Sequence, residues 1–99
     1  MKVYTEAVQF KADQKLIDVI EKKLTKMDVF FDRILNARVV LKLENSGQVR
    51  DKIVEVRLNV PGETLLASSV NKTFEASVDD VVDSLKRQLN KYKEKMRDR

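Results

Sequence analysis

The chain has 99 residues, of which 36% are charged, a net charge of +4, and neither cysteine nor histidine. We expect one small domain over residues 1–99 with a single apolar core. Without cysteine and histidine the chain lacks disulfides, thiolate metal sites, the usual nucleophilic triads and the commonest metal ligand. A carboxylate pair could still perform acid–base chemistry, so the composition disfavours an enzyme without excluding one. We expect no catalytic residue, metal or cofactor.

The N-terminus, MKVYTEAVQF, alternates like a strand and lacks the apolar centre of a signal peptide. No apolar run approaches the length of a membrane span. The sequence therefore predicts a cytoplasmic protein that does not associate with a membrane.

The first elements are a strand over Lys2–Phe10 and a helix whose N-cap is Asp13. Apolar residues recur in that helix at spacings of three and four and predict one buried stripe. The stripe consists of Leu16, Ile17, Ile20, Leu24 and Met27. The next segment is expected to close one end of the core with Phe30, Phe31, Ile34 and Leu35.

Two strands follow, Ala37–Glu44 and Lys52–Val60, separated by a turn at NSGQ (45–48). Their alternation predicts an antiparallel sheet with one wet face. The inward positions are Val39, Leu41, Leu43, Val54, Val56, Leu58 and Val60, and the outward positions are Arg38, Lys42, Glu55, Arg57 and Asn59. Pro61 and Gly62 predict a tight turn, with Gly62 free to take a positive φ, before a fourth strand over Thr64–Val70.

The last and longest periodic segment predicts a helix with Asn71 as its N-cap. Its apolar stripe contains Val78, Val81, Val82, Leu85, Leu89, Tyr92 and Met96. The predicted fold is therefore α+β with the order β-α-β-β-β-α. A right-handed crossover makes the first two strands parallel, and two hairpins complete a four-stranded mixed sheet. Both helices should lie parallel, side by side, on one face of that sheet.

Positive charge is concentrated near the C-terminus, where residues 85–99 hold seven Lys or Arg against one Glu and one Asp. In the first predicted helix, EKKLTK also exposes lysines. Two neighbouring basic helix faces favour a surface that follows phosphates. Basic residues at the end of a helix also complement its dipole, and this purely structural interpretation stays open for the last helix.

Other candidate sites are weaker. Asp79 and Asp83 lie one turn apart and could hold Mg²⁺, but acids near a helix start more often complement the dipole. Tyr92 is expected to be a core residue with its hydroxyl at the edge, and Tyr4 to lie on the open sheet face. One aromatic residue there is too few for a sheet that reads single-stranded RNA.

EKKLTKMDVFFDRI, NVPGETLLA and SVDDVVDSLKRQLNKYKEK, in this order, resemble the ribosome hibernation promoting factors. This family is also described as protein Y, the ribosome-associated inhibitor, or the sigma-54 modulation proteins. The resemblance covers nearly the whole chain, and the two helical segments are specific as a pair. It implies the same β-α-β-β-β-α order, similar in arrangement to a double-stranded RNA-binding domain.

The resemblance implies that the protein binds the small ribosomal subunit in stationary phase or starvation. It would occupy the channel of messenger RNA and the anticodon ends of transfer RNAs, contacting ribosomal RNA and neighbouring ribosomal proteins. The family's basic positions correspond to Lys22, Lys23, Lys26, Arg87, Lys91 and Lys93. Lys86 is added because of its place on the helix, and Asp79 and Asp83 are interpreted as structural.

Long members of the family carry a second domain that pairs ribosomes, and this chain ends at Arg99. We therefore expect a short form, or a fragment of a long one, that is monomeric when free and takes no small-molecule substrate. Three alternatives remain: a general double-stranded RNA-binding module, a regulator that binds an acidic protein, and an enzyme using Asp79, Asp80 and Asp83.

Overall fold

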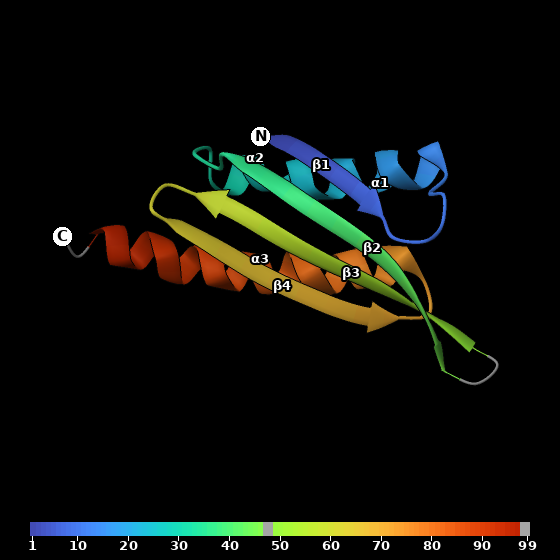
Figure 1. Ribbon diagram of the computed structural model, residues 1–99. Coiled ribbons are helices and arrows are strands. Elements are labelled where there is room, and N and C mark those ends of the chain that lie inside the picture. Colours follow the sequence, from blue (N-terminus) through green and yellow to red (C-terminus); the bar gives the residue numbers. More distant parts are fainter. Residues whose placement is uncertain (47–48, 98–99) are drawn as a thin grey trace.

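The computed structural model describes residues 1–46 and 49–97, and it has one four-stranded sheet in the order β1-β2-β3-β4. The elements are β1 (Lys2–Ala7), α1 (Gln14–Thr25), α2 (Met27–Phe30), β2 (Asn36–Ser46), β3 (Val49–Val60), β4 (Glu63–Asn71) and α3 (Phe74–Arg97). β1 pairs with β2 in parallel, and the other two pairings are antiparallel (Figure 1). The predicted α+β fold and its order of strands are confirmed, with the short α2 as an addition.

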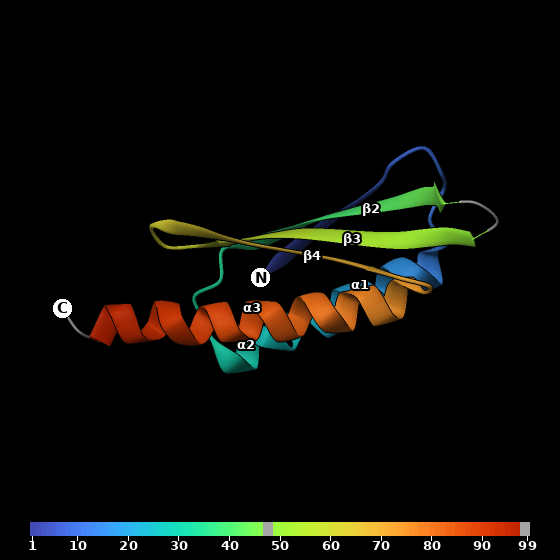
Figure 2. The ribbon, with the colours of Figure 1, turned by 90° about the horizontal axis from the view of Figure 1, so that it is seen from below.

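The molecule has two layers, because α1, α2 and α3 all lie on one face of the sheet (Figure 2). α1 and α3 run side by side in the same direction, as the strand directions predicted. None of the helices in residues 1–46 and 49–97 lies on the other face of the sheet. None of the helices in the described residues combines the length and the apolar character that crossing a membrane requires.

The core lies between the sheet and the helices. On β3 the alternation predicted from the sequence is confirmed, since Val54, Val56 and Leu58 are at most 2% exposed. The helices contribute Ile20, Leu24, Met27, Phe74, Val78, Val81, Leu85, Leu89 and Tyr92. Burying each large side chain contributes about 1.5–3 kcal/mol relative to leaving it exposed.

Two apolar residues are more exposed than predicted. Leu35 is 58% exposed, so it does not close the core, whereas its neighbour Ile34 is buried. The chain turns at residues 32–33. Because this segment is neither helix nor strand, its sequence has no hydrophobic periodicity from which the buried side chain could be predicted. Met96 is 36% exposed, and the C-terminal end of α3 extends beyond the ends of the strands (Figure 2).

The helix starts differ in how well they were predicted. Asp13 caps α1 as expected, since its Oδ1 accepts the backbone N–H of Lys15 at 3.2 Å. The prediction for Asn71 is wrong, because Asn71 is the last residue of β4. α3 begins at Phe74, and Thr73 Oγ1 accepts the backbone N–H of Ala76 at 3.1 Å, which is an N-cap bond.

The turn after β3 has the predicted chemistry. Gly62 has a φ of +79°, a conformation that glycine adopts without the steric cost of a Cβ. The hydroxyl of Tyr92 donates a hydrogen bond of 2.6 Å to the Pro61 carbonyl, so the end of α3 is tied to this turn. Of the turn predicted at 45–48, residues 47 and 48 lie outside the described residues.

β1 is shorter than the predicted strand over Lys2–Phe10, because Gln9 adopts a φ of +62° that strands do not allow. The chain then brings the ring of Phe10 onto that of Phe74, with centroids 5.6 Å apart and planes at 11°. This stacked pair packs the start of α3 against the segment that precedes α1.

Candidate nucleic-acid interface

The outer face of α1 and α3 is basic. Lys22 and Lys26 on the α1 side, and Lys86, Arg87 and Lys91 on α3, are all exposed. None of these five side chains has an ion-pair or hydrogen-bond partner among residues 1–46 and 49–97. Their cationic groups are therefore available to a ligand.

Lys23 has a partner on the neighbouring helix. Its ammonium forms an ion pair of 2.7 Å with Asp79 Oδ1. The Lys23 side chain is 31% exposed and that of Asp79 is 59% exposed, so the pair sits at the surface of the seam between α1 and α3. The Asp79 carboxylate is therefore bound by a side chain of the neighbouring helix α1.

Lys93 also has an intramolecular contact. Its Nζ donates a hydrogen bond of 3.0 Å to the Phe30 carbonyl and lies 4.4 Å from the centroid of the Phe30 ring. Because an ammonium has three N–H donors, this bond leaves capacity for a further acceptor. Sequence reasoning missed the partner, since α2 is too short to show a helical period.

The two contacts fix how the helices align. Lys23 lies beside Asp79 near the start of α3, and Phe30 lies beside Lys93 near its end. Lys26, between them in the chain, therefore lies along the middle of α3, the part of that helix that carries Lys86 and Arg87. The structure thus places the basic residues of the two neighbouring helices at the same level along the helix axes.

The acidic start of α3 is bound to the sheet. Asp80 Oδ2 accepts hydrogen bonds from Asn71 Nδ2 at 2.8 Å and from Ser69 Oγ at 3.0 Å, both on β4. These two bonds, that from Asn71 first, lower the pKa of Asp80 below its ordinary value of 3.8. In the described part of the chain no group of three or more His, Cys, Asp or Glu residues could hold a metal ion.

Residues 3–97 match the model of one protein family, described as sigma 54 modulation protein / S30EA ribosomal protein. The match covers almost all of the chain. The chain belongs to this family. The family resemblance noted from the helical segments is thereby confirmed.

Similar members of the S30EA family are named ribosome hibernation promoting factors. The protein of that name from Pseudomonas putida is 34% identical over 95 residues, which are 96% of this chain and 89% of the relative. The one from Escherichia coli strain K12 is 33% identical over 84 residues, 85% of this chain and 84% of the relative. These are not names of enzymes, in agreement with the expectation that this chain is not an enzyme.

Solved structures of S30EA-like proteins share the fold. A ribosomal subunit interface protein from Coxiella burnetii superposes with a TM-score of 0.81 at 26% identity, covering 94% of this chain and 98% of the other. The N-terminal domain of Protein Y from Thermus thermophilus gives a TM-score of 0.79 at 27% identity, covering 93% and 99%. The arrangement of the two helices on the sheet is therefore shared with these proteins.

Proposed function

We propose that this protein is a ribosome hibernation factor that binds the small ribosomal subunit and inhibits translation. Its relatives are named ribosome hibernation promoting factors, and a structure with the same fold is a ribosomal subunit interface protein. The observation that supports the proposal is that two neighbouring, parallel helices each expose cationic side chains that have no partner among residues 1–46 and 49–97. Ribosomal RNA is the polyanion that such a surface fits.

The contacts in this proposal are directed at phosphates. Lys22, Lys26 and Lys91 act as mobile point charges, whereas the planar guanidinium of Arg87 can bind two oxygens of one phosphate. Such contacts position the protein on the RNA without reading its bases. Lys86 extends the same surface, and Lys23 and Lys93 join it while remaining close to Asp79 and Phe30.

Inhibition follows from occlusion. With the helices against ribosomal RNA near the decoding centre, the sheet behind them occupies the space that messenger RNA and the anticodon end of transfer RNA need. The protein performs no chemistry in this mechanism and needs no cofactor. We place it in the cytoplasm, as a monomer when free, acting through one ribosome-binding domain over residues 1–99.

Two binding experiments test the proposal. Saturating protein should prevent transfer RNA from binding to programmed small subunits, and simultaneous stable binding of both would contradict occlusion. The affinity for small subunits should fall steeply with salt, with a log–log slope of roughly −4 to −5 if about six phosphates are neutralised.

Competition separates this function from general recognition of duplex RNA. Binding to small subunits should persist in excess double-stranded RNA if the ribosome is the specific partner. If the duplex displaces the protein at equal phosphate concentration, the chain is instead a double-stranded RNA-binding module without ribosome preference.

A further inference from the structure

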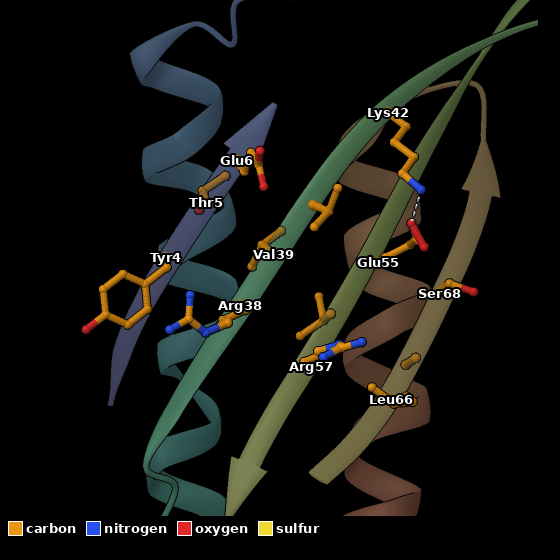
Figure 3. Close-up of a pocket in the computed structure, with 13 residues that line it drawn as sticks. Tyr4, Thr5, Glu6, Arg38, Val39, Lys42, Glu55, Arg57, Leu66 and Ser68 are labelled. Carbon is orange, nitrogen blue, oxygen red and sulfur yellow. Dashed lines mark ion pairs between the residues drawn. The ribbon is translucent and has the colours of Figure 1, made fainter. Parts of the chain in front are cut away.

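The helix-free face of the sheet carries a second cationic feature. Tyr4, Arg38, Arg57 and Leu66 form one row across all four strands, because they are successive partners in the register of β1, β2, β3 and β4. All four are exposed, and they line a hollow of about 720 Å³ (Figure 3). Small-ligand pockets in proteins measure about 300–1,000 Å³.

Two arginines stand directly opposite one another in this row. Directly opposed like charges destabilise a pair of strands unless an anion lies between them. The Arg38 guanidinium lies 5.1 Å from the centroid of the Tyr4 ring, and Arg57 extends toward β4 (Figure 3). Arg57 has no partner in the part of the chain that the structure describes. Both guanidinium groups are on flexible stems, so a rotation of side chains can bring them onto one phosphate.

The neighbouring row has a different character. Val40 lies between the carboxylates of Glu6 and Glu55 in the register of the sheet, and Glu55 is held by Lys42 at 2.6 Å. Glu6 has no partner within residues 1–46 and 49–97. Carboxylates beside the arginines repel a ligand that is anionic throughout, such as polyphosphate or an acidic peptide. They accept hydrogen bonds from hydroxyl and amino groups.

The exposed apolar surface completes the site. Leu66, 58% exposed, ends the arginine row, and the half-buried Val40 also lines the hollow. A flat aromatic base can lie on such a surface or on the plane of a guanidinium. The hollow thus offers cations for a phosphate, carboxylate acceptors for hydroxyl or amino donors, and an apolar platform for a base.

We propose that the open face of the sheet binds a single nucleotide unit, with its phosphate on Arg38 and Arg57 and its base against Leu66. One exposed aromatic residue does not suffice to read a strand base by base, so the site takes one unit. That unit is either a free nucleotide or one residue of an RNA strand. The site lies on the opposite side of the sheet from the basic helices and does not depend on ribosome binding.

Titration of the free protein tests this site by NMR, with AMP and an adenylate pentamer as probes. Both should shift the amide signals of residues near Arg38, Arg57 and Leu66 to saturation at millimolar concentrations or below. A pentamer that binds these residues several times more tightly than AMP assigns the site to an RNA strand, and equal affinity assigns it to a free nucleotide.

Variants locate the contacts. Arg38→Gln and Arg57→Gln should each weaken AMP binding about tenfold, the loss expected for one charge-assisted contact. Leu66→Ala should weaken AMP but not ribose 5-phosphate, which has no base. Lys11→Gln removes an exposed charge away from the site and should change nothing.

Three results would overturn the inference. These are the absence of shifts on the open face at millimolar AMP, equally tight binding of ribose 5-phosphate and AMP, or an undiminished affinity for AMP in both arginine variants. Because ribosomes are absent from the titration, any of these results leaves the proposed function untouched. Loss of ribosome binding by variants of the helices would conversely leave this site untouched.

Discussion

Lys23 of α1 and Asp79 of α3 are joined by an ion pair of 2.7 Å that spans the seam between the two helices. In the proposed function, an RNA phosphate would compete with Asp79 for the same ammonium. Exposed pairs of this kind contribute about 0–1 kcal/mol to stability. Removing the Asp79 carboxylate should therefore change the free energy of unfolding little, but it should make the surface of the two helices more positive.

Asp79→Ala should lower the free energy of unfolding by at most about 1 kcal/mol. It should also strengthen binding to small subunits by up to about fivefold at low salt, because a repulsive charge is removed and Lys23 is released. Urea denaturation and sedimentation measure the two effects. Asp83→Ala is the control for stability, since Asp83 is exposed and has no partner in the described residues. Weaker binding by Asp79→Ala alone would show that the pair instead holds the helices in position.

Asp80 should make stability depend on pH. Its pKa is lower in the folded protein than its ordinary value of 3.8, owing to the hydrogen bonds from Asn71 and Ser69. A group of this kind stabilises the fold above its unfolded pKa, and the contribution is lost as the pH falls through the folded value. Asp80→Ala should therefore be less stable than the wild type at pH 7, and the difference should disappear below the folded pKa. Urea midpoints from neutral pH down to the acid limit of folding measure this, and a difference independent of pH would contradict it.

Tyr92→Phe should cost about 1 kcal/mol of stability, the net value of a typical hydrogen bond. The lost bond joins the hydroxyl to the Pro61 carbonyl, while the ring keeps its edge-on contact with Phe31 at 5.6 Å between centroids. Tyr4→Phe is the matched control, because Tyr4 is 47% exposed on the open face. Equal stability of the two variants in thermal or urea unfolding would show that the bond to Pro61 contributes nothing.

The elements with a clear period could be predicted from the sequence. Alternation placed Val54, Val56 and Leu58 in the core, and the spacing of three and four did the same for Leu85 and Leu89. These patterns report burial directly, because strands and helices repeat with periods of 2 and 3.6 residues. The mixed sheet and the parallel helices then followed from connection rules.

The errors fall where no period exists. Leu35 follows an irregular turn, and Asn71 precedes α3 by three residues, where Thr73 proved to be the cap. A residue with a good capping side chain can also bond across to another element, as Asn71 does to Asp80. Local sequence alone does not distinguish these two uses.

The exposure of Lys22, Lys26, Lys86, Arg87 and Lys91 could be predicted from the sequence, but the intramolecular partners of Lys23 and Lys93 could not. The contacts Lys23–Asp79 and Lys93–Phe30 join residues 56 and 63 positions apart. They depend on the packing of α1 and α2 against α3, which the periodic pattern does not fix. The open-face row of Tyr4, Arg38, Arg57 and Leu66 likewise depends on the register of four strands.

The central claim is that the joint surface of α1 and α3 holds the ribosome. Co-sedimentation with small subunits tests it most directly, using a variant in which Lys22, Lys26, Arg87 and Lys91 are all changed to Glu. A control variant changes Lys2, Lys11 and Lys72, exposed lysines outside both helices, to Glu. We predict that the first variant remains folded by circular dichroism and no longer sediments with the subunits, while the control still does. Undiminished sedimentation of the first variant would contradict the proposed surface.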